Sequence, residues 1–313
     1  MLRLAMTTRA ETFERVRDPL ADRGIRVEHV PTDERTVGLT DPGGEWDGFD
    51  AGFVYPSRPM EGGVADALLS VPWVNDREAV LTSRNKAHVY AALARAGLPV
   101  PETTLVSNPA DEGDVVAAAR DLGFPLVVKP TSTTRGVGVA RAGDVDSLLG
   151  VVDYLNLLHE FPATGDRSFL LQRYVPEARD YRAMVIDGAY AGAVERRLPD
   201  EAVEEGRWKH NVHRGAEATG VDLPPPARDL AERTAAALGI DYLGVDLLAV
   251  DAGGDDTDAG GDDAVDTTDD RRWLVNETNA RPTVDEATKY EPGFYDRLAA
   301  LIRRTAERSV ENG

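Results

Sequence analysis

The sequence predicts an α/β protein in which a small N-terminal domain, built on a parallel sheet, precedes two α+β subdomains. Strand-like and helical segments alternate up to Asn75, and beyond it apolar strand-like segments occur in pairs joined by polar turns. The chain has 313 residues, 42% of them hydrophobic, which is more than one small core needs. We therefore expect three units, at residues 1–95, 96–171 and 172–313.

The N-terminal unit is expected to alternate strands and helices. Its candidate strands are 2–7, 25–30 and 51–55, and its candidate helices are 10–23 and 63–70. A dinucleotide-binding unit would carry G-x-G-x-x-G after the first strand, but the chain reads Thr7-Thr8-Arg9-Ala10 there. This unit is therefore not predicted to hold a nucleotide.

The next segments prepare a hairpin with an unusual loop. Ser83 is the candidate N-cap of a helix over 84–96, and a second helix is expected over 111–123. A strand over 124–130 then leads into a loop of hydroxyls and glycines that ends with Gly136-Val137-Gly138. Glycine lets backbone N–H groups approach an anion closely, so the loop is a candidate cover for phosphates. An ordinary hairpin turn is the commoner explanation of this loop taken alone.

Basic residues gather in the C-terminal unit although the chain is strongly acidic. The cluster consists of Arg182, Arg196, Arg197, Lys209 and Arg214. Such a cluster favours an anion site, whereas pairing with a neighbouring carboxylate would explain any single member. His210 and His213 have a spacing seen in metal sites, but no further ligand motif lies near them, so zinc is not predicted.

Three oxygen-bearing residues point to a site for a hard cation. Asp246 interrupts an apolar strand over 242–250, and Glu277 and Asn279 lie two apart on a returning strand over 273–282. Residues two apart share one face of a strand, and a hairpin could place Asp246 opposite them. Carboxylate and amide oxygens suit Mg²⁺ that retains waters and substrate phosphates.

The composition excludes several classes of protein. A formal net charge of −20, from 35 basic and 55 acidic residues, argues against binding to nucleic acid through phosphate neutralisation. The absence of cysteine excludes thiolate metal sites, disulfides and cysteine nucleophiles. No Walker sequence occurs, which excludes the P-loop NTPases. No segment resembles a signal peptide or membrane span, so we expect a cytoplasmic protein.

Charge is distributed unevenly along the chain. The run 251–270 carries nine Asp and no basic residue, and it is interpreted as a solvated loop between two strands. Lysine occurs only at positions 86, 129, 209 and 289. This usage is typical of halophilic proteins, which function at very high salt. The few lysines are therefore expected where a compact ammonium is needed.

Taken together, these motifs resemble the ATP-grasp superfamily and, within it, the RimK-like α-L-glutamate ligases. The resemblance extends from about Asn75 to Pro282 and rests on runs that occur in the family's order. They are Arg84-Asn-Lys86, Phe124-Pro-Leu-Val-Val-Lys129, Leu171-Gln-Arg-Tyr-Val175, Asp180-Tyr-Arg182, Glu195-Arg-Arg197, Asn211-Val-His-Arg-Gly215, Asp246 and Glu277-x-Asn279. The resemblance implies two subdomains that clasp ATP and a ligase that joins a carboxylate to an amine through an acylphosphate.

The resemblance also implies roles for single residues. Nucleotide binding would fall to Lys86, Lys129, Gly136, Gly138, Gln172, Arg173, Tyr174, Val175, Asp180, Lys209 and Asn211. Asp246, Glu277 and Asn279 would hold Mg²⁺ or Mn²⁺. Arg182, Arg196 and Arg214 would bind the substrate carboxylates or stabilise the intermediate. The expected substrates are an amino acid, with glutamate first, and a carboxylate acceptor that is a small molecule or a protein tail; neither nucleic acid nor membrane is expected.

Two departures from the family pattern leave alternatives open. Arg173 stands where the family's adenine-contacting segment, matched here by 171–175, usually has an acidic residue. Ala280-Arg281-Pro282-Thr283-Val284-Asp285 follows Asn279 where a small residue, Pro and Gly are usual. The second departure lies near the family's acceptor site, so the acceptor is left open. A ligase acting on a carrier protein or cofactor tail and a non-catalytic ATP-binding module are the alternatives, and homo-oligomerisation is undecided.

Overall fold

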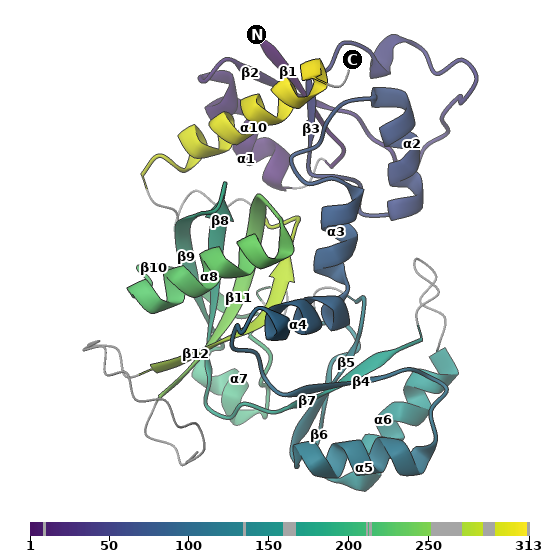
Figure 1. Cartoon of the computed structure of the whole chain (residues 1–313), viewed down its shortest axis with the longest axis vertical. Coiled ribbons are helices and arrows are strands. Elements are labelled where there is room, and N and C mark those ends of the chain that lie inside the picture. Colours follow the sequence, from purple (N-terminus) through teal and green to yellow (C-terminus); the bar gives the residue numbers. More distant parts are fainter. Residues whose placement is uncertain are drawn as a thin grey trace.

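The computed structural model describes residues 1–8, 11–133, 136–158, 167–210, 212, 215–251, 271–283 and 292–311. Its strands form a three-stranded sheet near the N-terminus, a four-stranded sheet in the middle of the chain and a five-stranded sheet near the C-terminus. Figure 1 shows the N-terminal sheet at one end of the molecule, the four-stranded sheet at the other and the five-stranded sheet between them. Within the described ranges, no helix is both long and apolar enough to cross a membrane.

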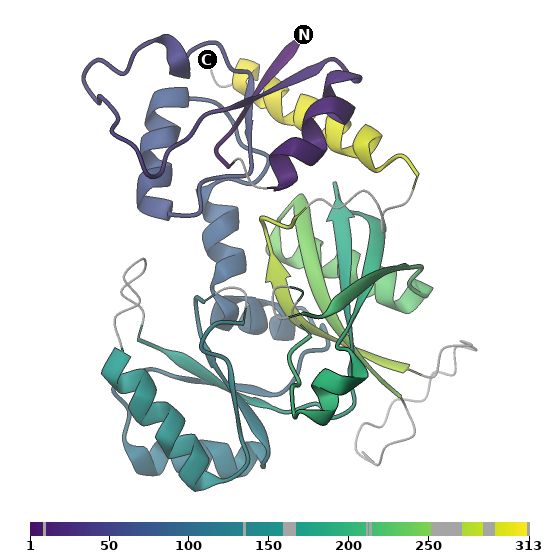
Figure 2. The ribbon, with the colours of Figure 1, turned by 180° about the vertical axis from the view of Figure 1, so that it is seen from behind.

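The N-terminal sheet is parallel, as predicted, with the strand order β2-β1-β3. Its elements are β1 (Leu2–Met6), α1 (Glu11–Ala21), β2 (Ile25–His29), the 3-10 helix η1 (Gly44–Trp46), β3 (Ala51–Phe53) and α2 (Pro59–Leu69). The last helix, α10 (Phe294–Glu311), returns to this sheet, and its Leu298 and Ile302 share a buried cluster with Leu4 and Leu20. Figure 2 shows α10 in yellow beside α1 in purple.

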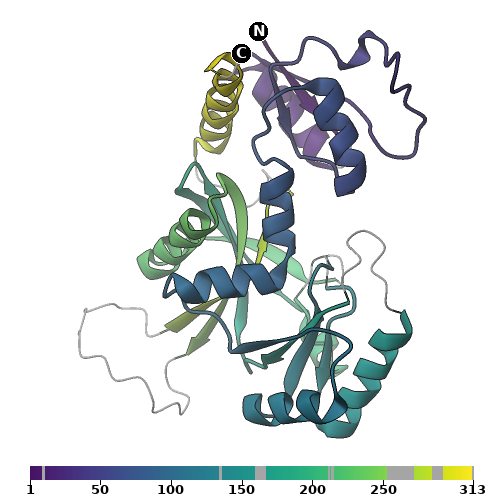
Figure 3. The same cartoon turned by 45° about the vertical axis from the view of Figure 1, so that its right-hand side comes forward.

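The helix expected over 84–96 is wrong in its start and in its cap. The chain forms α3 (Arg77–Arg84) and α4 (Lys86–Arg95), separated at Asn85, whose backbone is extended. The side chain of Asn85 caps α4 by accepting from the backbone N–H of His88 at 3.1 Å. Ser83 instead lies inside α3, where its side chain is buried and its hydroxyl contacts the hydroxyl of Thr278. Figure 3 shows the two helices along the side of the five-stranded sheet.

The four-stranded sheet is antiparallel, with the order β4-β7-β5-β6. Its elements are β4 (Thr103–Val106), α5 (Glu112–Leu122), β5 (Leu126–Pro130), β6 (Ala140–Ala142), α6 (Val145–Leu158) and β7 (Phe169–Arg173). Leu126 and Val128 pack in one cluster with residues of α5 and α6. Because side chains alternate along a strand, Val127 and Lys129 lie on the opposite face of the sheet.

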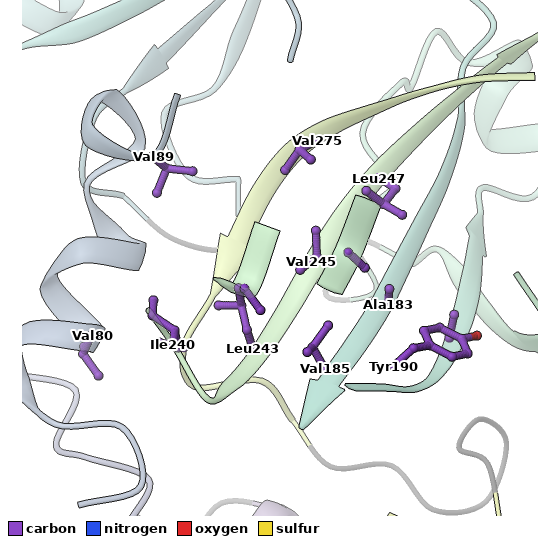
Figure 4. Packing of buried hydrophobic residues seen from close by; sticks show 14 of the residues in the cluster. Val80, Val89, Ala183, Val185, Tyr190, Ile240, Leu243, Val245, Leu247 and Val275 are labelled. Carbon is purple, nitrogen blue, oxygen red and sulfur yellow. The ribbon is translucent and has the colours of Figure 1, made fainter. Parts of the chain in front are cut away.

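The five-stranded sheet is antiparallel, with the order β10-β9-β8-β11-β12. Its elements are β8 (Arg179–Ile186), β9 (Ala189–Arg197), α7 (Asp200–Glu204), β10 (Glu217–Val221), α8 (Pro225–Leu238), β11 (Tyr242–Asp251) and β12 (Arg271–Asn279). One face packs on α8, α3 and α4. Figure 4 shows Val245 and Leu247 of β11 and Val275 of β12 on the same side as Val80 and Val89 of the two helices.

A buried polar seam joins α3 and the segment before it to the ends of β11 and β12. The amide nitrogen of Asn75 donates to the carbonyls of Tyr242 and Ala280, at 2.6 and 2.7 Å. The hydroxyl of Ser83 accepts from the backbone N–H of Ala280 at 3.0 Å and lies 3.1 Å from the hydroxyl of Thr278. These bonds fix the end of β12 relative to α3.

The seam makes Asn75 important for stability. In Asn75→Ala, two buried carbonyls lose their donor, and we expect the free energy of unfolding to fall by about 2 kcal/mol. Asn156→Ala is the matched control, because the side chain of Asn156 accepts an exposed hydrogen bond from Asn108. The loss of that bond should cost less than about 0.5 kcal/mol. Urea unfolding at high salt measures both values. Equal losses would show that the buried hydrogen bonds of Asn75 stabilise the fold no more than an exposed one does.

Candidate active site

A cavity of about 560 Å³ lies between the four-stranded and five-stranded sheets. The predicted site residues that line it are Lys86, Lys129, Gly136, Gln172, Arg173, Tyr174, Val175, Asp180, Arg196, Lys209, Asp246 and Glu277. Gly138, Arg182 and Asn279 are not among the lining residues. Asn211 and Arg214 lie outside the described residues. The structure thus gathers twelve predicted residues, from segments far apart in the sequence, around one space.

Two buried lysines enter the cavity from different elements. Lys86 begins α4, and its ammonium donates to the carbonyl of Thr133 and lies 3.2 Å from a carboxylate oxygen of Glu277. Lys129 comes from β5, and its ammonium donates to the amide oxygen of Asn276 at 2.9 Å and to the hydroxyl of Tyr90 at 3.4 Å. Burial lowers the pKa of Lys129 to about 8, although Glu277 opposes this.

The glycine loop follows β5 directly and needs its glycines. Gly136 and Gly138 both have positive φ angles, of 66° and 72°. A Cβ atom at Gly138 would lie 2.8 Å from Cγ of Pro130, so a side chain there would clash with the end of β5. Beyond the loop, the ammonium of Lys209 donates to the carbonyl of Val139. This bond ties the hairpin of the four-stranded sheet to the segment that precedes β10.

The carboxylate of Asp246 sits at the centre of a buried ion network. Arg182 of β8, its partner in the strand register, donates to both of its oxygens, at 2.6 and 2.8 Å. Arg196 of β9 lies 2.9 Å from the second oxygen and also donates to Asp180 at 2.5 Å. Burial alone would raise the pKa of Asp246, but the two guanidinium groups outweigh it and hold this pKa at about 2.

Asp180 has the opposite balance. Burial raises its pKa to about 6, and the neighbouring charge of Asp246 adds to this effect, although Arg196 opposes both. The two aspartates thus share one guanidinium but differ in their affinity for a proton.

The strand β12 contains an irregularity that the sequence did not predict. Asp246 pairs with Glu277 and Leu247 pairs with Val275, so Asn276 is an extra residue at a bulge. The bulge accompanies the contact between Asn276 and Lys129, and the backbone carbonyl of Asn276 accepts from the hydroxyl of Tyr90. In a regular strand Asn276 would face away from Glu277, so the sequence alone does not predict that it lines the cavity.

The carboxylate oxygens of Asp246 and Glu277 are suitable ligands for a divalent cation. They are paired on adjacent strands, both line the cavity, and both present hard oxygen ligands. Asn279 does not line the cavity, and its amide oxygen accepts from the backbone N–H of Arg281 at 2.8 Å. In the described part of the chain, no cluster of three or more His, Cys, Asp or Glu forms a metal site by itself. Two carboxylates would therefore leave further coordination positions to substrate oxygens and water.

The lining of the cavity includes an aromatic and cationic group of which only Tyr174 was predicted from the sequence. Tyr174 and Trp208 meet edge to face, with ring centroids 6.1 Å apart. The guanidinium of Arg141 lies 5.4 Å from the first ring and 5.9 Å from the second. Register alone could have placed Arg141 on the cavity face, because it pairs with Val127 of β5. The guanidinium of Arg173, next to Tyr174, pairs with Glu102 at 2.6 Å.

Comparisons with known proteins agree on one family. A family model described as a RimK-like ATP-grasp domain matches residues 83–254. A probable alpha-L-glutamate ligase of Sodalis glossinidius is 34% identical over 182 residues, which are 58% of this chain and 57% of that protein. A protein of the same description from Klebsiella pneumoniae is 32% identical over 236 residues, 74% of this chain and 68% of that one. A ribosomal protein bS6–L-glutamate ligase of Escherichia coli is 31% identical over 182 residues, with coverages of 58% and 56%.

These matches are partial on the side of the relatives, because the chain spans little more than half the length of the Sodalis and Escherichia proteins. Two solved structures extend the likeness to nearly the whole chain. A RimK domain ATP-grasp protein of Sphaerobacter thermophilus aligns with a TM-score of 0.64 at 22% identity, covering 97% of this chain and 98% of that one. The ATP-grasp ligase PsnB, complexed with a minimal precursor, aligns with a TM-score of 0.64 at 16% identity and the same coverages. At these identities the likeness shows the fold alone.

The network around Asp246 should matter for stability as well as for chemistry. Asp246→Asn removes the charge shared by Arg182 and Arg196, and we expect the free energy of unfolding to fall by about 3 kcal/mol. Asp200→Asn breaks the exposed pair with Arg197 and should cost less than about 0.5 kcal/mol. Denaturant unfolding of both variants measures the difference. A small effect at Asp246 would contradict the central position given to its charge.

Proposed function

Because the chain belongs to the RimK-like ATP-grasp family, we propose that it is an ATP-dependent carboxylate–amine ligase. It would join the amine of glutamate, or of a related amino acid, to the carboxylate of an acceptor and release ADP and phosphate. The observation that carries this proposal is the convergence of Lys86, Lys129 and Lys209 on the cavity that also holds Asp246 and Glu277. Cations for a triphosphate and carboxylates for its metal ion thus line one space between two sheets.

The chemistry explains why such a site is needed. A carboxylate is a poor electrophile, because attack by an amine would add charge to an anionic centre. Transfer of the γ-phosphoryl group to the carboxylate gives an acylphosphate, from which an amine can displace phosphate. The protein must therefore align two anions and neutralise their charge while water is excluded.

The nucleotide would lie between the two sheets. We assign the triphosphate to the three lysines, covered by the loop with Gly136 and Gly138. The base would face the hinge over 172–175, with Val127 above it and Leu248 below, since these side chains line the cavity from opposite sheets. Lysine suits this task because its ammonium is a compact charge that can exchange a carbonyl partner for a phosphate oxygen.

Mg²⁺ or Mn²⁺ fits the carboxylates of Asp246 and Glu277. When bound there, the ion would neutralise the phosphate oxygens and polarise the phosphoryl group that is transferred. Arg196 lines the cavity and is assigned to the substrate carboxylate. Arg182 does not line it, so its assigned task changes from binding substrate to holding Asp246 in place.

The acceptor is proposed to be a carboxylate of a protein or peptide. One relative is described as a ligase of glutamate to a ribosomal protein, and one structural neighbour was solved with a precursor. The first test is therefore a panel of acidic peptides and amino acids at high salt. We expect release of ADP that depends on the acceptor, a hydroxamate when hydroxylamine replaces the amino acid, and loss of about 100-fold or more in turnover for Glu277→Gln.

A folded preparation that binds ATP tightly but gives neither ADP nor hydroxamate with any acceptor would contradict the ligase assignment. It would favour the non-catalytic ATP-binding module instead.

The pKa of Lys129 predicts a pH dependence of nucleotide binding. At pH 8 about half of the ammonium is deprotonated before ATP binds, and the triphosphate favours the charged form. ATP should therefore bind with uptake of a proton near pH 8, and its affinity should fall as the pH rises further. Calorimetry in two buffers of different ionisation enthalpy measures the uptake. Lys129→Met should bind ATP about 10- to 100-fold more weakly and show no uptake; an unchanged uptake would assign the proton to another group.

A further inference from the structure

His210 lines the cavity next to Lys209 but has no part in the reaction as described so far. Its ring is half-buried, and Nδ1 lies 3.2 Å from the backbone carbonyl oxygen of Arg196. A carbonyl oxygen only accepts hydrogen bonds, so Nδ1 must carry the proton. The neutral ring then has a lone pair on Nε2. Among the residues that the structure describes, none bonds to Nε2.

The surroundings of His210 favour its neutral form. Burial lowers its pKa, and the charge of Arg196 acts in the same direction, whereas Glu195 and the bond to the Arg196 carbonyl oppose them. On its own segment, Arg207 and Lys209 also line the cavity. On β8, Arg179 is bound to Glu195 and Asp180 is bound to Arg196, so neither carboxylate is free to hold a proton-bearing ring.

The other basic groups that line the described cavity are engaged. The carboxylates of Asp180, Asp246 and Glu277 each pair with a cation. The ammonium of Lys129 donates to Asn276 and Tyr90. Glu177 remains, but it is exposed on the turn after β7. His210 is therefore the half-buried side chain of this cavity with an uncommitted basic atom.

A ligase of this kind needs such an atom. The incoming amino acid is an ammonium ion at neutral pH, and an ammonium has no lone pair with which to attack. We propose that His210 is the general base that takes a proton from the incoming amine. This inference rests on the proposed function. The N–H bond of the ammonium breaks and its proton passes to Nε2. The freed lone pair attacks the acyl carbon, and the bond to phosphate breaks with its electrons on the departing oxygen. The nitrogen then gives its second surplus proton to the departing phosphate, which leaves a neutral amide. The imidazolium then returns the proton to water.

Hydroxylamine distinguishes a general base from a structural or nucleotide-binding residue. It is largely uncharged at neutral pH, so it can attack the acylphosphate without first losing a proton to a base. In His210→Asn, the side-chain amide can still donate to the carbonyl of Arg196 while the basic nitrogen is lost. We expect ligation of glutamate to an acceptor peptide to fall by about 100-fold or more. Hydroxamate formation by the same variant should stay within about threefold of the wild-type rate, which also shows that the variant is folded and binds ATP. His210→Gln serves as a second variant, and Glu177→Gln as the matched control for a carboxylate at the mouth of the same cavity.

The pH profile gives a second readout. The wild-type rate with glutamate should decline at low pH as His210 becomes protonated, whereas the rate of His210→Asn should rise by about tenfold per pH unit, following the fraction of free amine. Equal losses with glutamate and hydroxylamine would overturn the proposal, because they would assign His210 to structure or nucleotide binding. A selective loss in Glu177→Gln instead would move the base to Glu177 and also overturn it. If the wild-type chain formed no hydroxamate, that result would contradict the proposed ligase function itself. It can be told apart from the two outcomes above, which concern only the identity of the base.

Discussion

The carboxylate of Asp246 is buried in the five-stranded sheet, and a buried charge is tolerated only where it is paired. Arg182 and Arg196 provide the pairing from β8 and β9, which requires that three strands lie in one register. Strand β11, which holds Asp246, also pairs with β12, and this pairing places Glu277 beside Asp246. The seam through Ser83 and Asn75 fixes the end of β12. The position of the proposed metal ligands therefore depends on ion pairs and hydrogen bonds that reach across the molecule.

Arginine and lysine are used differently around the cavity. Arginine makes the fixed pairs with carboxylates, where its planar group can bond two oxygens at once. The described lysines, Lys86, Lys129 and Lys209, all line the cavity, and each donates to a carbonyl or amide oxygen, although Lys86 also pairs with Glu277. Such contacts are easily exchanged for phosphate oxygens. In an acidic chain that avoids lysine, this distribution agrees with a site for a highly charged ligand.

The fold class and the family could be predicted because their signals are local. Short, nearly continuous apolar segments predicted β5 and β11, and Asp246 was notable because it interrupts an apolar strand. Features that depend on distant partners could not be predicted. The pairing of Arg182 with Asp246 needs the register of β8, the bulge at Asn276 needs the register of β12, and α10 is placed by a sheet at the other end of the chain. His210 was noticed only for its spacing to His213, whereas its tautomer follows from a backbone carbonyl that the sequence does not locate.

Activation of a carboxylate by phosphorylation is the reaction proposed for this cavity, and an isotope measurement tests it most directly. An acidic peptide acceptor whose carboxylates carry the heavy oxygen isotope is incubated at high salt with the protein, ATP, Mg²⁺ and glutamate, and the released phosphate is analysed by mass spectrometry. If an acylphosphate forms, its bridging oxygen comes from the acceptor and leaves with phosphate, so each phosphate released should carry a single heavy oxygen. Phosphate without the label, released while the glutamylated product forms, would contradict activation through an acylphosphate.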